Sequence, residues 1–373
     1  MLPYIIVFII NFFLGLLTDK FYYKNRFISI LCLVIIGLIN TIFVGFRDFG
    51  VGYDTNLYIN AYFNSATNIT SIRDFLYVED VDRGFLFLAC ISHYYSNDSQ
   101  SLLVVTELFI ITFTLLGLYY YKKKNNLSVA QFLVFYWLIL FFFSENFMRQ
   151  YCAMSLLFFG YSQFMNDRKL LYVCIQILAF FFHSSSLFFA VVPVFTIISK
   201  FGYKKRLGFV IIVNIFFLLF VIAYSYFLPL LGSFEIVSEI YVDRYSGREN
   251  GSGRIFMGVF YLVSIYIQYI IYRQTKQVGY MTDDESFMYI NLLILTIWLR
   301  LLCAYDVNLD RMALYVEQIY LVYLSLAFNN RNVNSLLKTV LILIMLRSCI
   351  RSSFNPDYEP QNYTYSSKIL EIY

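Results

Sequence analysis

Long runs of apolar residues, separated by short polar segments, follow one another along almost the whole chain. Most runs have about the 17–25 residues with which a helix crosses roughly 30 Å of hydrocarbon. We therefore expect an all-α, polytopic integral membrane protein: a single transmembrane domain over 1–373, with about twelve membrane helices in a range of ten to twelve. The expected spans are 3–17, 27–46, 101–120, 128–144, 148–164, 170–183, 185–199, 207–231, 255–272, 287–304, 312–328 and 335–349.

The spans at 170–183 and 185–199 depend on a break between them. One continuous helix of about thirty residues would be roughly 45 Å long, too long for the bilayer without a heavy tilt. A break at "HSSS", which begins at His183, predicts two short helices that meet at one membrane face.

Composition agrees with the membrane prediction. Hydrophobic residues make up 60% of the chain and charged residues only 14%, against roughly 25% charged residues in soluble domains. The first apolar run lacks the basic segment and the small-residue cleavage site of a signal peptide, so we expect a retained helix. The six cysteines form no CxxC motif and are expected to be buried thiols.

The lysines indicate which side of the membrane each connection faces. Segments such as "DKFYYKNR", "KKKNN" and "SKFGYKKR" alternate along the predicted spans with connections that lack lysine. The positive-inside rule makes the lysine-rich side cytoplasmic. Both termini then face outward, and the outer face carries loops at 47–100 and 232–254 and a tail at 350–373.

Arginine gathers on the outer side, where the positive-inside rule disfavours positive charge. Its planar fork of donors matches phosphate and carboxylate, whereas lysine is a point charge. The pattern indicates an anionic ligand at the outer mouth, although each arginine could instead pair with a nearby acid such as Asp48, Asp74, Asp82 or Asp243. The outer arginines are Arg47, Arg73, Arg83, Arg149, Arg244, Arg248, Arg254, Arg311, Arg347 and Arg351.

The densest polar patch is "GFRDFGVGYDT", at the outer end of the span 27–46. It contains Arg47, Asp48 and Asp54 together with three glycines, which allow close approach to a ligand or positive φ. A charged helix end with a glycine C-cap is the alternative. That alternative accounts for the first half of the patch but not for its second half.

"SENFMRQYCA" begins the span 148–164. On one continuous helix Asn146, Arg149 and Gln150 share a face, which would direct Arg149 into the protein. The structural alternative is an ion pair between Glu145 and Arg149, four residues apart.

His183 is one of only two histidines in the chain. An imidazole with a pKa near 6.5 can accept a proton at neutral pH. A histidine satisfied within the membrane protein is the equally weighted alternative. Because no second histidine or carboxylate stands at metal-ligand spacing, no metal site is expected.

Three further groups of charged residues extend the candidate set. One lies at the mouth of the span 312–328, one lies on the glycine-rich outer loop, and one lies within the hydrocarbon, where ionisable residues are functional candidates. The last could instead pair with Glu317. In that order, the residues are Asp310 and Arg311, then Arg244 and Arg248, then Arg300.

Four motifs, "GFRDFGVGYDTNLY", "NFMRQ", "AFFFHSSSLF" and "NLDRMALYVE", occur in this order between about residues 40 and 330. In order and sidedness they resemble the EpsG family, a branch of the Wzy-type O-antigen and capsule polymerases. The resemblance implies a multi-pass glycosyltransferase of the bacterial inner membrane with a GT-C-like architecture. It also implies that oligosaccharides linked to undecaprenyl pyrophosphate are polymerised at the outer face.

The resemblance assigns roles to the candidates. The arginines would hold the pyrophosphate, with Arg149, Arg311 and Arg47 as first choices and Arg244, Arg248 and Arg300 as second choices, and with Asp48 and Asp310 beside them. The general base would be His183 or Asp54, which the sequence leaves open. No soluble cofactor is needed, and a chain-length regulator is an expected partner in addition to membrane lipid.

Other functions remain open. An O-antigen ligase-like enzyme would use the same donor and the same arginine chemistry. A flippase for lipid-linked oligosaccharides would need charge along a path open to both sides, and an acyltransferase would need a histidine reached from the cytoplasm. The chain has no Walker motif, no GxSxG and no nucleic-acid-binding module, so nucleic acid is not an expected partner.

Overall fold

The computed structural model describes residues 2–52, 54–79, 81–125, 127–201, 307–329, 334–353 and 365–372, with scattered positions between 208 and 299. Side chains at 125, 307–310 and 347–353 are outside this description. Contacts divide the chain into two compact units. The first is Met1–Leu187 with Leu321–Asn329 and Ile342–Tyr373, and the second is Phe188–Tyr320 with Asn330–Leu341.

Among the described residues the secondary structure is helical, apart from an isolated bridge between Ser367 and Ile372. The N-terminal helices are α1 (Leu2–Phe21), α2 (Arg26–Gly45), α3 (Thr55–Tyr58), the π-helix η1 (Ile59–Phe63), α4 (Asn64–Ala66), α5 (Ile72–Tyr77), α6 (Arg83–Tyr95) and α7 (Gln100–Asn125). The later ones are α8 (Val129–Ile139), α9 (Phe141–Asn146), α10 (Met148–Met165), α11 (Lys169–Phe182), the 3₁₀ helix η2 (Ser184–Ala190), α12 (Val191–Ile198), α17 (Val307–Asn329) and α18 (Ser335–Ser353).

The helical fold is confirmed for the described residues, and its apolar helices agree with a membrane protein. In the described part of the chain, α1, α2 and α7 are long and apolar enough to cross a membrane. The expected spans at 207–231, 255–272 and 287–304 fall largely outside the described residues. The total of twelve spans, the GT-C-like architecture and the single domain therefore stay predictions.

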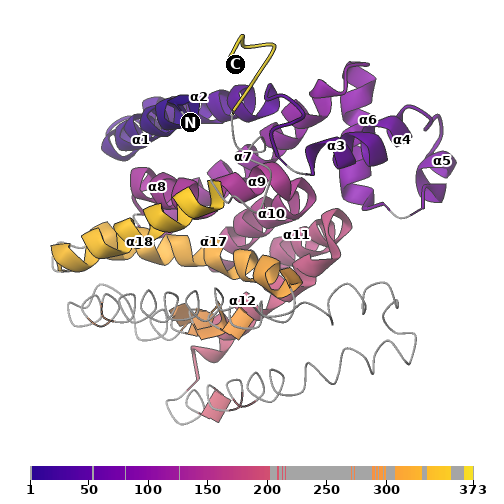
Figure 1. Ribbon diagram of the computed structural model, residues 1–373. Coiled ribbons are helices and arrows are strands. Elements are labelled where there is room, and N and C mark those ends of the chain that lie inside the picture. The colour runs from indigo at the N-terminus through magenta and orange to yellow at the C-terminus, as the bar shows by residue number, and fades with distance from the viewer. Residues whose placement is uncertain are drawn as a thin grey trace, which may run out of the picture. The chain divides into compact units, whose positions relative to one another are not determined.

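Close contacts between helices organise the first unit, in which α1 and α2 form an antiparallel pair (Figure 1). The buried amides of Asn11 and Asn40 hydrogen-bond each other at 3.1 Å across that pair. A Cβ at Gly45 would lie 2.9 Å from the Cα of Val104, so glycine lets α2 approach α7. Small residues and paired amides are the usual means by which membrane helices associate.

Asp19 connects α1 to α7 and α8 at one end of the first unit. Its carboxylate accepts hydrogen bonds from Lys122 Nζ at 2.7 Å, from Ser128 Oγ at 2.8 Å and from the backbone N–H groups of Val129 and Ala130. The ends of α1 and α7 and the start of α8 therefore meet at one place. These are the lysine-rich connections that the sequence assigns to one side of the membrane.

The C-terminal segment 365–372 lies at the opposite end of α2. The hydroxyl of Tyr365 donates to the carbonyl of Phe43 at 2.7 Å, and Ser367 Oγ donates to the carbonyl of Phe46. The carboxylate of Asp48 accepts from the N–H of Lys368 at 3.0 Å. The tail and the loop that follows α2 thus lie at one end of the unit, and the side of the membrane that this end faces stays a prediction.

The loop between α2 and α7 is folded into short helices, α3 to α6. It is closed at its base by Gln100, whose Nε2 donates to the carbonyls of Gly45 and Arg47. Further along the chain, the predicted break at His183 is present. α11 ends at Phe182, His183 is extended (φ −163°, ψ 122°), and η2 follows.

Candidate functional site

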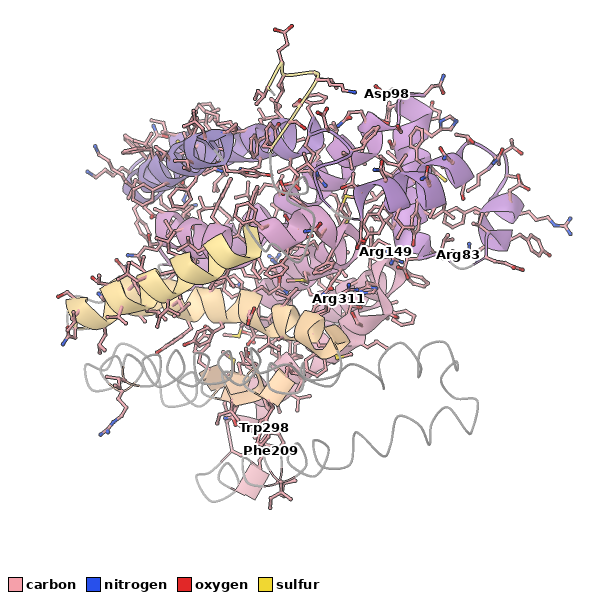
Figure 2. The ribbon with its side chains drawn as sticks, in the orientation of Figure 1. Arg83, Asp98, Arg149, Phe209, Trp298 and Arg311 are labelled. Atoms are coloured by element: carbon pink, nitrogen blue, oxygen red, sulfur yellow. The ribbon has the colours of Figure 1, made fainter. Side chains whose placement is uncertain are left out.

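Arg149 occupies the centre of the candidate site. Its Nη1 donates to Asp82 Oδ2 at 2.6 Å and to the hydroxyl of Tyr62 at 2.8 Å. Figure 2 labels Arg149, the second residue of α10, and Arg83, which directly follows Asp82. The side chains of Arg149 and Asp82 are 31% and 23% exposed, so solvent reaches this ion pair.

Asp82 is held in place by its backbone and by the packing of its helix. Its N–H donates to the hydroxyl of Tyr62 at 3.2 Å, so this hydroxyl accepts from both Asp82 and Arg149. A Cβ at Gly84 would lie 2.7 Å from the ring of Phe182. Glycine therefore lets the first turn of α6 lie against the end of α11.

That packing brings His183 to the same carboxylate. Nδ1 of His183 lies 3.9 Å from Asp82 Oδ2, and the imidazole is 26% exposed. Arg149 on α10 and His183, which directly follows α11, thus both lie near one oxygen of Asp82. We call Asp82, Arg149, His183, Tyr58 and Tyr62 the Asp82 cluster.

Two tyrosine rings lie next to the guanidinium of Arg149. Cζ of Arg149 lies 5.4 Å from the ring centroid of Tyr58 and 5.6 Å from that of Tyr62, within the range of cation–π attraction. Both rings are almost fully buried and pack against Phe85. Arg149 is therefore preorganised by rigid neighbours.

Burial and charge oppose each other at Asp82. Burial raises the pKa of the Asp82 carboxyl, and the adjacent guanidinium of Arg149 partly offsets that rise. Burial likewise raises the pKa of Tyr62, which stays a neutral phenol beside the arginine. A half-buried carboxylate of this kind depends on its cationic partner.

Arg47 has a different position from the one expected of a phosphate ligand. Its side chain is 1% exposed. Nε donates to the carbonyl of Val51, Nη1 to that of Val44 and Nη2 to that of Glu145, at 2.9–3.2 Å. These hydrogen bonds connect the end of α2 to the following loop and to α9. The guanidinium therefore stabilises the protein interior.

The glycine at position 52 also serves an internal contact. Gly52 has φ +93°, and a Cβ there would lie 2.7 Å from the carbonyl oxygen of Glu145. Thr55 Oγ1 donates to the carbonyl of Val51 at 2.9 Å and closes the turn. The close approach expected at this motif is therefore an approach to α9.

The alternative ion pair between Glu145 and Arg149 is wrong. The chain breaks at Phe147 between α9 and α10, so the two residues do not lie on one helix. The buried carboxylate of Glu145 accepts from the hydroxyl of Tyr4 at 3.1 and 3.3 Å. Arg149 pairs with Asp82 instead.

Sequence neighbours are not the partners of the loop arginines. Arg83 donates to the carbonyls of Phe75 and Leu76 at the end of α5. Asp74 accepts from Thr70 and from the N–H of Ser71, and these hydrogen bonds lower its pKa. Pairing with an adjacent acid therefore does not explain these side chains.

The other candidates are not joined to the Asp82 cluster by the contacts described above. Asp54 directly precedes α3, and its carbonyl accepts from the N–H of Tyr58. Arg311 lies on α17 in the second unit. Arg244, Arg248, Arg300 and the side chain of Asp310 lie outside the described residues. In the part of the chain that is described, no group of three or more His, Cys, Asp or Glu could hold a metal ion.

Sequence reasoning missed Asp82 as a member of the site. It read this residue as a partner for Arg83, whereas the partner is 67 positions away in the chain. Asp82 occupies the N-cap of α6, where aspartate usually binds its own helix, yet its side chain makes no capping hydrogen bond.

The chain belongs to the EpsG family, whose model matches residues 30–367. This family comprises Wzy-like polymerases. Family membership therefore suggests a polysaccharide polymerase as the class of this protein. Comparisons with curated proteins and with solved structures found no match.

Proposed function

We propose that this protein polymerises oligosaccharide repeat units carried on undecaprenyl pyrophosphate, at the outer face of the bacterial cytoplasmic membrane. Membership of the EpsG family supports the polymerase class. The observation that carries the site is the part-exposed Arg149, which lies over two adjacent tyrosine rings and beside both an acid and a histidine.

In the proposed reaction, a hydroxyl at the non-reducing end of one glycan attacks the anomeric carbon of another. A glycosidic bond forms, and the bond from the anomeric carbon to the pyrophosphate oxygen breaks with its electron pair. Arg149 stabilises the charge that develops on the pyrophosphate. Because its fork is already oriented, this stabilisation costs little reorganisation during the reaction.

His183 is the proposed general base that takes the proton of the attacking hydroxyl. Between His183 and Asp54, the shared carboxylate of Asp82 favours His183, because it places the imidazole beside the arginine. Arg311, Arg244, Arg248 and Arg300, with Asp310, complete the proposed set at the outer mouth. Arg47 and Asp48 contribute by holding the loop.

The test is a gel of surface glycan from the host with the gene deleted, complemented with the wild type or with variants. We expect the deletion to leave a single repeat unit in place of the ladder, and Arg149→Ala and His183→Ala to do the same at normal protein level. Arg73→Ala is the matched control, since Arg73 is an exposed loop arginine that lies over Tyr77. Loss of every attached repeat on deletion would contradict a polymerase and indicate a ligase or a flippase.

A further inference from the structure

Asp82 stands between the two residues to which the proposed function gives separate tasks. The same atom, Oδ2, lies 2.6 Å from Nη1 of Arg149 and 3.9 Å from Nδ1 of His183. The first distance is a charge-assisted hydrogen bond, and the second is about 1 Å too long for one. In this structure the carboxylate therefore belongs to the arginine.

The surroundings allow the carboxylate to move while its backbone stays fixed. The N–H of Asp82 is bound to Tyr62, and the following turn packs against Phe182 through Gly84. The side chain does not cap α6, so a change of partner breaks no helix cap. A movement of the carboxylate by about 1 Å toward His183 would bring it to hydrogen-bond distance from Nδ1.

We propose that Asp82 is a positioning residue that leaves Arg149 for His183 when a pyrophosphate binds. This inference rests on the proposed function. A phosphate oxygen competes with the carboxylate for the fork of Arg149, and the two anions repel each other. The displaced carboxylate then binds Nδ1 of His183, which already lies 3.9 Å from it.

The exchange would couple donor binding to activation of the base. A hydrogen bond from Nδ1–H to Asp82 holds the tautomer in which Nε2 carries a lone pair. Nε2 takes the proton of the acceptor hydroxyl, whose oxygen bonds to the anomeric carbon while the lipid pyrophosphate leaves with the electron pair. Asp82 stabilises the imidazolium, which afterwards gives its proton to solvent, so the base is oriented only when a donor is bound.

Within the part of the chain that the structure describes, the groups shown next to Asp82 and its arginine come from four elements. They are Arg149 on α10, His183 at the end of α11, Tyr62 on η1 and, behind the guanidinium, Tyr58 on α3. Histidine is the residue type among them whose unperturbed pKa lies near neutral pH. A shift of the pH profile can therefore be assigned to the imidazole.

The test compares purified full-length wild type with Asp82→Asn and Asp82→Ser, supplied with lipid-linked repeat units. Asparagine and serine both suit the N-cap position, so α6 should still form. We expect kcat to fall by about 100-fold or more, the scale of lost general-base catalysis. KM for the donor should fall or stay the same, because Arg149 no longer has a competing carboxylate.

The pH profile separates positioning from a structural role. A carboxylate beside the imidazolium raises the pKa of the base, so both variants should shift the acid limb of kcat to lower pH. Asp82→Glu should restore part of the rate. Asp74→Asn is the control, since Asp74 is an acid of the same loop that binds only its own turn.

A second measurement needs no turnover. Inorganic pyrophosphate should raise the pKa of His183 in the wild type and raise it much less in Asp82→Ser. The pKa is measured from the pH dependence of chemical modification of the imidazole, in proteins that also carry His93→Asn. The chain has only two histidines, so the signal is unambiguous. An equal shift in both proteins, no shift in the wild type, or an unchanged acid limb would overturn the inference.

Failure of the proposed function and failure of the role given to Asp82 produce different experimental results. A wild-type protein that makes no polymer from lipid-linked repeats contradicts the proposed function itself. A wild type that polymerises while Asp82→Asn keeps its kcat contradicts only the role given to Asp82.

Discussion

Replacing Arg149 with lysine keeps the positive charge but removes the planar arrangement of hydrogen-bond donors. Lysine can still approach Asp82, but it cannot donate as a planar fork. In the structure one nitrogen of Arg149 serves both Asp82 and Tyr62, while the guanidinium lies over two rings. The substitution therefore tests whether geometry, and not charge alone, supports the reaction.

The magnitude follows from the contacts. A hydrogen bond to a charged group contributes about 1.5–3 kcal/mol, and an exposed cation–π contact contributes about 0.5–1 kcal/mol. Because the ion pair is nearly a third exposed and lysine retains part of each term, we expect a loss of about 1–2 kcal/mol. That corresponds to a fall in kcat of about 5- to 30-fold.

The assay is the initial rate of polymer formation by purified protein from lipid-linked repeats. Arg149→Ala should lose more, about 100- to 1,000-fold, which is typical for removal of a group that stabilises developing charge. Arg73→Lys provides the matched control and should keep the wild-type rate. A wild-type rate in Arg149→Lys would show that the planar donors of the guanidinium are not needed, which would refute this prediction.

Two further predictions concern the loop that holds the site. Arg47→Ala should lower the free energy of unfolding by about 3 kcal/mol or more, and with it the melting temperature, because three carbonyls lose their donor. A variant with normal stability but no turnover would contradict this prediction. Gly52→Ala should destabilise by about 1–3 kcal/mol, since φ is +93° and a Cβ would meet the carbonyl of Glu145. Gly50→Ala, with no atom within 4 Å of its Cβ, should change the melting temperature little; equal effects at 50 and 52 would contradict the contact.

Features set by the bilayer could be predicted from the sequence. The expected spans 27–46 and 101–120 correspond to α2 (Arg26–Gly45) and α7 (Gln100–Asn125), because the length of an apolar run reports the hydrocarbon thickness. The break at His183 could be predicted because one helix across both runs would be too long for the bilayer. These inferences need only local composition and a fixed length scale.

Features set by long-range packing could not be predicted. Arg149 could be recognised as a candidate, but its partner Asp82 comes from a loop 67 positions earlier, whose fold depends on tyrosines and glycines in contact with other helices. Arg47, like Arg149, is an arginine predicted at the outer membrane face, yet its side chain is buried. Residue type and sidedness alone do not separate these two arginines, since the difference lies in which backbone carbonyls the folded loop presents.

The most direct test of the central claim is reconstitution of the purified protein in vesicles, with lipid-linked repeat units as the only substrate. We expect a ladder of products longer than one repeat, release of one lipid pyrophosphate for each bond formed, and loss of both in Arg149→Ala. Movement of unreacted lipid-linked units across the vesicle membrane, without any ladder, would contradict the account.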